Sequence, residues 1–351
     1  MTIRLKNLEQ QTMVITGATS GIGLTTARRA ARAGTQLVLV ARSSDALDEL
    51  AHELRGKGAQ VATVAADVGN EADVARITRT AVEHFGRIDT WVNNAGASVY
   101  GRIDEVDTED MRRVFDTNFW GIVYGSLEAV KHFKSRSGPG ALINLGSEAS
   151  DVALPLQGIY SASKHAVKGF TNALRLELEK ERAPISVTLI KPASIDTMFP
   201  QHAKNYMDEE PTLPPPVYAP DLVADAILQC AQRSKTEVFV GGGAKANSAG
   251  SYHAPRMFDR LMRLTIFGMQ KSGRPTAPHR RDALHATNPD TELRERGGVA
   301  RKVYEHSAYT AASLRSSPLP SPLTSLAIGG VLLAAWNMTQ RANREPAQSP
   351  L

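Results

Sequence analysis

The chain contains a single cysteine, Cys230, so it cannot form an internal disulfide. One cysteine is typical of a protein from a reducing compartment, and we interpret Cys230 as a small buried apolar residue. The first residues, MTIRLKNLEQQ, lack the apolar stretch of a secretory signal, which predicts a cytoplasmic location. The nine histidines fall into no HExxH or Cys/His spacing, so we predict no metal site.

Aromatic residues make up only 6% of the chain, and they are not interleaved with its basic residues. We therefore do not expect nucleic acid as a partner. Residues 1–245 contain 27 Lys+Arg and 29 Asp+Glu, a net of −2, while residues 246–351 contain 14 and 7, a net of +7, and the two sum to +5. A near-neutral body thus carries a basic tail, which favours an anionic surface as a partner.

Short segments rich in β-branched residues alternate with helix-length amphipathic segments from Thr12 to about Val240. Strands that are buried on both faces have this composition. The repeated strand–helix–strand order predicts an α/β fold, a doubly wound parallel sheet of about seven strands with right-handed crossovers. The expected strands are 12–16, 36–41, 60–66, 88–94, 141–146, 185–191 and 237–241.

Two later regions depart from this rhythm. Residues 192–220 are too long for a simple connection, and we interpret them as a lid or binding loop, with a plain surface insertion as the alternative. After Gly243 the strand pattern stops. We therefore expect three parts: an α/β domain at 1–245, a basic and partly helical extension at 246–320, and an apolar C-terminal segment with a polar tail at 321–351.

The first expected strand runs directly into TGATSGIG at 16–23. Its glycines let the backbone turn tightly and approach a pyrophosphate. The helix that starts near Ile22 would point its N–H groups and its positive dipole end at that anion. A glycine trio between the first strand and the first helix of an alternating α/β chain indicates a dinucleotide site.

The GxxxGxG spacing, NNAG at 93–96, Ser147 and the YxxxK pattern of Tyr160 and Lys164 resemble the short-chain dehydrogenase/reductase family over about residues 8–245. The resemblance implies a Rossmann-like fold, a nicotinamide dinucleotide cofactor, oxidoreductase activity and a homo-oligomer. The alternative is a catalytically silent nucleotide-binding regulatory relative. Such a relative would be expected to lose Tyr160 or Lys164, and both are present.

Tyr160 and Lys164 are four positions apart, so a helix places them on one face. A nearby ammonium favours the phenolate and lowers the phenol pKa from its usual value of about 10. The resemblance gives Tyr160 the acid/base role, and we expect Lys164 to tune it and to reach the cofactor ribose. It further implies that Ser147 holds the substrate oxygen and that Asn118 positions a water behind the lysine. For Asn118, bonding to backbone at a helix irregularity is the alternative.

The end of the second expected strand reads VARSS at 40–44, with Arg42 and no carboxylate. NAD-preferring enzymes place an acidic residue there, whereas a guanidinium can pair with a 2′-phosphate. We therefore predict NADP(H) rather than NAD(H), with a solvated helix-entry residue as the alternative for Arg42. By the resemblance, the cofactor-binding residues are Gly17, Thr19, Ser20, Gly21, Ile22, Gly23, Arg42, Asp67, Val68, Asn94, Ala95, Gly96, Tyr160, Lys164, Pro192, Ile195 and Thr197.

The segment after the sixth strand departs from the family pattern. The family usually has Pro-Gly there, and this chain has Pro192 followed by Ala193, so we expect the loop beside the nicotinamide to run slightly differently. The segments expected to line the substrate pocket are mostly apolar, which predicts a hydrophobic alcohol or ketone without identifying it. These segments are 98–101, 148–149, 153–157 and 196–218, with Tyr100, Glu148 and Gln157 as polar groups.

The tail contains two apolar stretches. At 254–271, apolar residues alternate with arginines, as in a basic amphipathic helix that lies in a membrane interface. A helix packed on the enzyme's own surface or on its dimer partner is the alternative. Residues 323–336 carry no charge but are shorter than the roughly twenty residues of a membrane span. Residues 322–338 are thus open to three interpretations: they span a membrane, lie on it, or avoid it.

Overall fold

The computed structural model describes residues 3–315, so the expected C-terminal segment at 321–351 and its apolar run lie outside the described residues. The contacts divide the chain into the units Met1–Leu314 and Arg315–Leu351. The first unit therefore contains both the α/β domain and the extension that follows it as far as residue 314.

The first unit is built on a seven-stranded sheet in which every neighbouring pair is parallel, with the order β12-β7-β6-β4-β1-β2-β3. The chain runs outward from β1 in both directions, which confirms the predicted doubly wound sheet. All seven strands occur where the sequence predicts them, to within two residues. They are β1 (Thr12–Thr16), β2 (Gln36–Ala41), β3 (Val61–Ala65), β4 (Thr90–Asn93), β6 (Gly140–Leu145), β7 (Ile185–Pro192) and β12 (Glu237–Val240).

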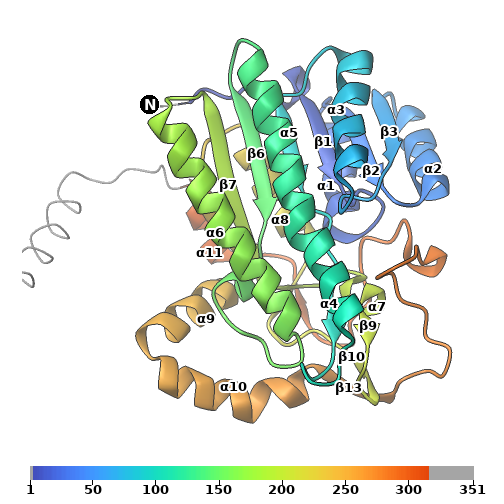
Figure 1. Ribbon diagram of the computed structural model, residues 1–351, viewed down its shortest axis with the longest axis vertical. Helices are drawn as coiled ribbons and strands as arrows, with labels where there is room; N and C mark the ends of the chain where they lie inside the picture. The colour runs from blue at the N-terminus through green and yellow to red at the C-terminus, as the bar shows by residue number, and fades with distance from the viewer. Residues whose placement is uncertain (1–2, 316–351) are drawn as a thin grey trace, which may run out of the picture. The chain divides into compact units, whose positions relative to one another are not determined.

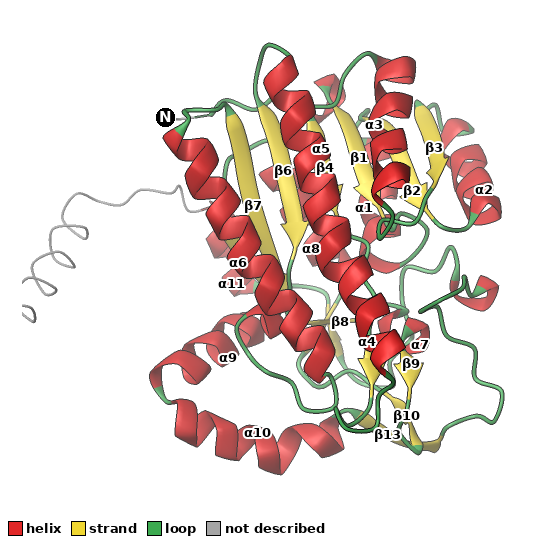
Figure 2. Cartoon of the chain, viewed as in Figure 1, coloured by secondary structure: helices red, strands yellow, loops and turns green. Residues whose placement is uncertain are grey.

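Helices cover both faces of the sheet (Figures 1 and 2). Packing follows the alternation of side chains along each strand, so Met13 and Ile15 face one helical layer and Val14 faces the other. One layer consists of α1 (Gly21–Arg32), α2 (Ser44–Arg55) and α8 (Pro220–Cys230). The opposite layer, in front of the sheet in Figure 2, consists of α3 (Glu71–Phe85), α5 (Gly121–Ser135) and α6 (Gly158–Lys180).

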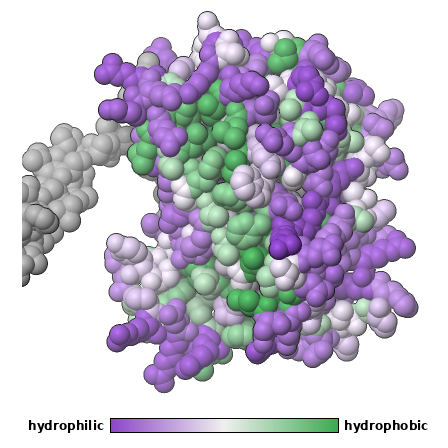
Figure 3. Space-filling view, viewed as in Figure 1, coloured by the Kyte–Doolittle hydropathy of each residue, from purple (hydrophilic) through white to green (hydrophobic). Residues whose placement is uncertain are grey.

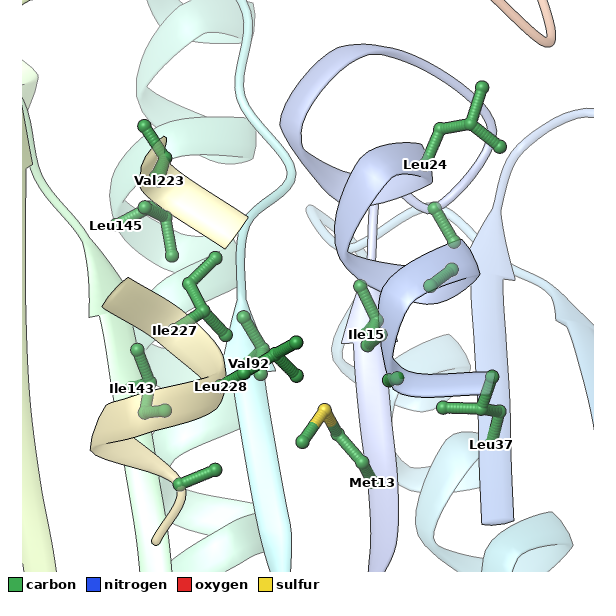
Figure 4. Close-up of a cluster of buried hydrophobic side chains, with 14 of the residues drawn as sticks. Met13, Ile15, Leu24, Leu37, Val92, Ile143, Leu145, Val223, Ile227 and Leu228 are labelled. Atoms are coloured by element: carbon green, nitrogen blue, oxygen red, sulfur yellow. The ribbon is translucent and has the colours of Figure 1, made fainter. Parts of the chain in front are cut away.

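The larger core cluster lies between the sheet and the first of these layers. Figure 4 shows Val223 of α8 next to Leu145 of β6, and Ile227 and Leu228 of α8 next to Val92 of β4. Cys230 is fully buried at the end of α8. Burial raises the pKa of its thiol to about 12, which fits the interpretation of Cys230 as a buried apolar residue.

The insertion and the extension meet at the carboxyl ends of the strands. The antiparallel pair β10–β13 and the parallel sheet β14-β11-β8 each join an insertion strand to an extension strand. The insertion contains β8 (Ser194–Ile195), α7 (Phe199–His202), β9 (Lys204–Asn205), β10 (Glu209–Pro211) and β11 (Val217–Tyr218). The extension contains α10 (Pro255–Met269), β13 (Lys271–Pro275), β14 (Val303–Tyr304) and α11 (Ala308–Arg315), preceded by α9 (Gly242–His253).

The expected amphipathic helix at 254–271 is present as α10, at the bottom of Figure 1. Its inner face buries Phe258 against the cluster that contains Tyr160, and its outer face exposes Met257, Leu261 and Leu264. Among residues 3–315, no helix combines the length and the apolar character needed to cross a bilayer.

Candidate active site

The glycine loop between β1 and α1 has the close-packed geometry that the sequence predicts. Gly17 and Gly21 adopt positive φ values of 66° and 51°, which glycine tolerates without strain. A Cβ added to Gly23 would lie 2.0 Å from the Gly17 carbonyl oxygen, so helix and loop approach too closely for a side chain. Asn94, after β4, ties the loop down by donating its Nδ2 to the Thr16 and Gly17 carbonyls at 2.9 and 3.2 Å. This cradle fits a pyrophosphate at the α1 N-terminus.

Two adjoining cavities open beside this loop. One, at the adenosine end expected from the sequence, contains Thr19, Arg42, Asp67 and Val68 in its walls. The other contains Ser147, Tyr160 and Lys164 together with Gly21 and Ile22, and extends past Pro192, Ile195 and Thr197. Gly17, Ser20, Ala95 and Gly96 border both cavities. Of the residues expected to be catalytic or to bind the cofactor, Gly23 and Asn118 are the two that line neither cavity.

Ser147, Tyr160 and Lys164 come from two elements. Tyr160 and Lys164 lie one turn apart at the start of α6, with Lys164 Nζ 5.7 Å from the centroid of the Tyr160 ring. Ser147 follows β6, and its Oγ accepts a hydrogen bond from the Ala149 backbone N–H at 3.1 Å. Tyr160 and Lys164 are 8% and 4% exposed, so their polar groups are largely shielded from bulk water.

The electrostatics of the pair differ from the expectation that Lys164 lowers the pKa of Tyr160. Burial raises the pKa of Tyr160 to about 12, while a hydrogen bond with Ser147 acts in the opposite direction and the Glu148 charge adds to the rise. Burial also lowers the pKa of Lys164 to about 8. Lys164 Nζ donates to the Leu145 carbonyl at 2.8 Å rather than to the phenol oxygen, so desolvation decides the phenol pKa in this structure.

Asn118 shows the backbone-bonding role that was the alternative for it. It is fully buried in a π-helical turn, Asp116–Trp120, between α4 (Thr108–Phe115) and α5. Its Oδ1 accepts from the Ala97 N–H at 2.7 Å, and its Nδ2 donates to the Ala97 carbonyl at 2.9 Å and to Ser163 Oγ at 3.0 Å. Asn118 therefore fixes the backbone beside Gly96 and couples it to α6.

The cavity around Tyr160 is mainly apolar and includes the insertion, as expected. Tyr100, Glu148 and Gln157 all lie in its walls. Glu148 is buried, which raises the pKa of its carboxyl, and it accepts a hydrogen bond from Asn247 Nδ2 at 3.0 Å. The apolar walls are Leu154, Met198, Phe199, Leu213 and Pro214.

Several residues of these cavities were not singled out from the sequence, although His202 lies within the segment 196–218 that was expected to line the substrate pocket. His202 of α7 borders both cavities, and burial next to Arg42 lowers the pKa of its imidazole to about 4. The extension contributes Asn247 beside Glu148, and Leu284 and Glu292 at the adenosine end. Only the helical period of 254–271 pointed to structure in the extension, so nothing local indicated these contacts.

Arg42 lies in the wall of the adenosine-end cavity but is not a solvated helix-entry residue. Its guanidinium donates to the backbone carbonyls of Ala283 and Leu284, the latter at 3.0 Å. Burial lowers the pKa of Arg42, and the nearby Arg113 adds to this effect. Among the described residues, no cluster of three or more His, Cys, Asp or Glu side chains has a geometry that could hold a metal ion.

Comparison with known proteins identifies the family to which the chain belongs. A family profile described as short chain dehydrogenase matches residues 11–207. An uncharacterised oxidoreductase of Bacillus subtilis, YxnA, is 44% identical over 340 residues, which are 97% of this chain and 93% of the relative. A putative oxidoreductase of Mycobacterium tuberculosis, SadH, is 32% identical over 69% of this chain and 90% of its own length.

Solved structures resemble about two thirds of the chain. An alcohol dehydrogenase from the archaeon Thermococcus sibiricus, solved in complex with 5-hydroxy-NADP, is 27% identical and superposes with a TM-score of 0.57 over 65% of this chain and 95% of its own. The profile match, the relatives and the doubly wound sheet agree with the motifs at 16–23, 93–96 and 160–164. The chain therefore belongs to the short-chain dehydrogenase family of oxidoreductases.

Proposed function

We propose that the protein is an oxidoreductase that transfers a hydride between NADP(H) and a hydrophobic alcohol or ketone. The observation that supports this best is that Ser147, Tyr160 and Lys164 line one cavity with the glycine loop. The bound dinucleotide would supply or accept the hydride. It would be held by the α1 N-terminus, by the cavity wall at Asn94–Gly96, and by Ile195 and Thr197.

Three side chains handle the proton and the substrate oxygen. During reduction, Tyr160 donates its phenolic proton to the carbonyl oxygen as negative charge develops there, and in oxidation it takes the proton back. Ser147 donates a hydrogen bond to the same oxygen. Lys164, whose pKa is about 8, is mainly protonated at neutral pH, so its charge favours the phenolate that forms when the proton leaves.

The preference for NADP(H) rests on Arg42. Its guanidinium lies at the end of β2 in the adenosine-end cavity, and β2 ends without a carboxylate. Guanidinium groups bind phosphate oxygens through paired N–H donors, and Arg42 has five donors of which the carbonyls at 283–286 use only part. The solved relative with bound 5-hydroxy-NADP is consistent with this choice.

The substrate class follows from the walls around Tyr160. They include the apolar residues Leu154, Met198, Phe199, Leu213 and Pro214, and Glu148 and Gln157 supply polar contacts. Such a cavity favours a mainly hydrophobic molecule with one polar substituent besides the reacting oxygen.

Titration of the full-length protein with NADPH and NADH, followed by a turnover screen of lipophilic ketones and alcohols, tests the proposal. We expect tighter binding of NADPH, and turnover that the Tyr160→Phe variant loses while it still binds the dinucleotide. Tighter binding of NADH would contradict the role of Arg42. Binding without turnover of any substrate would favour the silent regulatory alternative.

We also propose that the outer face of α10 contacts an anionic lipid surface. Met257, Leu261 and Leu264 recur at helical spacing and are 73%, 55% and 71% exposed. The exposed Arg256, Arg260 and Arg263 flank them, and Asp259 is the one acidic residue of the helix. Helices that lie in a membrane interface typically insert apolar side chains among the lipids, while neighbouring cationic side chains contact the lipid phosphates.

Co-sedimentation with vesicles tests the α10 proposal. We expect the protein to bind phosphatidylserine-containing vesicles and not purely zwitterionic ones, and the Leu261→Glu/Leu264→Glu variant to lose binding. Val82→Glu, on the exposed face of α3, is the matched control and should still bind. If the α10 variant instead alters only the oligomeric state, α10 contacts another copy of the chain and the lipid proposal is wrong.

A homo-oligomer is a further proposal. Leu127 of α5 and Leu176 of α6 are 51% and 57% exposed, and Trp120, at the end of the π-helical turn before α5, is 43% exposed. Figure 3 shows apolar surface over these helices. Packing of this face on a second copy would remove that surface from water. Light scattering should report more than one copy for the wild type, and fewer for a Leu127→Glu/Leu176→Glu variant; a monomeric wild type would contradict the proposal.

A further inference from the structure

Residues 282–294 of the extension, named here the strap, lie against the adenosine-end cavity (Figure 1, orange segment at the right). One end of the strap is anchored by Leu284, which is 1% exposed and packs with Val99, Val106 and Val114. The Leu284 carbonyl accepts hydrogen bonds from Arg42 at 3.0 Å and from Arg113 at 3.1 Å. This end therefore holds two cations of the cavity in place.

The other end of the strap is bonded directly to the glycine loop. The Leu293 N–H donates to the Thr19 carbonyl at 2.7 Å, and the Gly21 N–H donates to the Arg294 carbonyl at 2.9 Å. Between the two ends, Asn288 and Thr291 are buried. These backbone bonds fix the strap relative to the loop expected to hold the pyrophosphate.

The strap changes the charge of the cavity. Arg42 and Arg113 contribute two cations to its walls, and Asp67 binds Arg113. Glu292 of the strap contributes a second carboxyl, so two acidic groups offset the two basic ones. The sequence at the end of β2 shows only the positive charge of Arg42. In the folded cavity, the charges of these two basic and two acidic side chains sum to zero.

Glu292 itself faces the cavity without a full set of partners. Its Oε2 is buried and has no hydrogen-bond partner among the described residues. Burial raises the pKa of this carboxyl, whereas the Thr19 side chain and the Arg42 charge favour its ionised form. No salt bridge joins Glu292 to Arg42 within residues 3–315, so its charge is not cancelled by direct contact.

We propose that the strap is the outer wall of the dinucleotide site and that Glu292 is a specificity-determining residue that narrows the preference for NADP(H) over NAD(H). This inference rests on the proposed function. A 2′-phosphate placed near Arg42 enters a cavity that already holds the Glu292 carboxyl, and like charges repel. A 2′-hydroxyl meets no such repulsion. Arg42 therefore favours NADP(H), and Glu292 reduces the difference in affinity between NADP(H) and NAD(H).

Dissociation constants of full-length protein for NADPH and NADH test the inference. Glu292→Gln keeps the shape and removes the charge, and should shift the affinity ratio toward NADPH by about fivefold, the scale of one charge removed at a partly solvated site. Asp290→Asn is the matched control. It makes the same chemical change on the strap, at a side chain that is 75% exposed and absent from the cavity wall, and should leave the ratio unchanged.

The outcomes separate this inference from the proposed function. A shift toward NADPH in Glu292→Gln alone supports the role of Glu292, even if the wild type favours NADH and the role of Arg42 is thereby refuted. Equal ratios in the wild type and both variants overturn the inference and leave the proposed function standing. A wild type that binds neither dinucleotide overturns both.

Amide hydrogen exchange provides a second measurement that does not depend on a variant. If the strap walls the site, saturating NADPH should slow exchange in residues 282–294 of the wild type, with no comparable change in the last turns of α3, residues 79–85, which lead toward the amino end of β4. Unchanged exchange in the strap, in protein shown to bind NADPH, would contradict its assignment as a wall.

Discussion

Replacement of Lys164 by methionine should change the free energy of unfolding more favourably at neutral pH than at alkaline pH. Lys164 is 4% exposed, and burial lowers its pKa from 10.5 to about 8. The folded state therefore holds an ammonium that water solvates better in the unfolded chain. Methionine has similar volume and no charge, so it removes that penalty.

The magnitude follows from proton linkage. Between about pH 8 and 10.5 the unfolded chain binds more protons at Lys164 than the folded protein does, so the free energy of unfolding of the wild type rises with pH in that window. Below pH 8 both states are protonated and the penalty is constant. It amounts to about 3 kcal/mol at pH 7 and about 1 kcal/mol near pH 9.5. The unpaired Leu145 carbonyl of the variant costs about 1–3 kcal/mol at either pH.

Urea denaturation of the wild type and Lys164→Met at both pH values measures this effect. The stability of the variant minus that of the wild type should fall by about 2 kcal/mol from pH 7 to pH 9.5. Lys180→Met, which makes the same substitution at the exposed end of α6, is the matched control. A difference for Lys164→Met that does not change with pH would refute the argument that burial depresses this pKa.

Three further predictions concern the glycine loop, helix α6 and the candidate active site. Gly23→Ala should destabilise the fold by about 1–3 kcal/mol and abolish dinucleotide binding, because its Cβ would lie 2.0 Å from the Gly17 carbonyl oxygen. Gly169→Ala in α6 meets nothing within 4 Å and should stabilise by up to about 1 kcal/mol, as thermal unfolding of both variants would show. Ser147→Ala should lower kcat by roughly 10²–10³-fold with a loss of only about 1 kcal/mol of stability from its cap to Ala149, checked by steady-state kinetics and denaturation; unchanged kcat would exclude Ser147 from catalysis.

The sequence predicts the sheet well because the strands carry a strong local signal. Fully buried parallel strands such as QLVLVA at 36–41 need apolar residues on both faces, and the glycines at 17, 21 and 23 are required by local backbone geometry. The i,i+4 spacing of Tyr160 and Lys164 likewise fixes their relation on α6.

Contacts that join distant segments could not be predicted in this way. The carbonyls that hold Arg42 lie about 240 residues further along the chain, and backbone acceptors leave no mark in a sequence. Glu292 and Asn247 reach the cavities only because the extension folds back onto the α/β domain, where it contacts the glycine loop and Glu148. The direction of the Tyr160 pKa depends on burial, which the spacing of Tyr160 and Lys164 does not report.

Isotope transfer tests the central claim most directly. NADPH carrying deuterium at C4 of the nicotinamide, on either face, should be incubated with the full-length protein and a lipophilic ketone identified by the turnover screen. We predict deuterium at the carbinol carbon of the alcohol for the wild type, and no labelled alcohol for Tyr160→Phe with the dinucleotide still bound. Labelled alcohol formed at the wild-type rate by Tyr160→Phe would contradict the account.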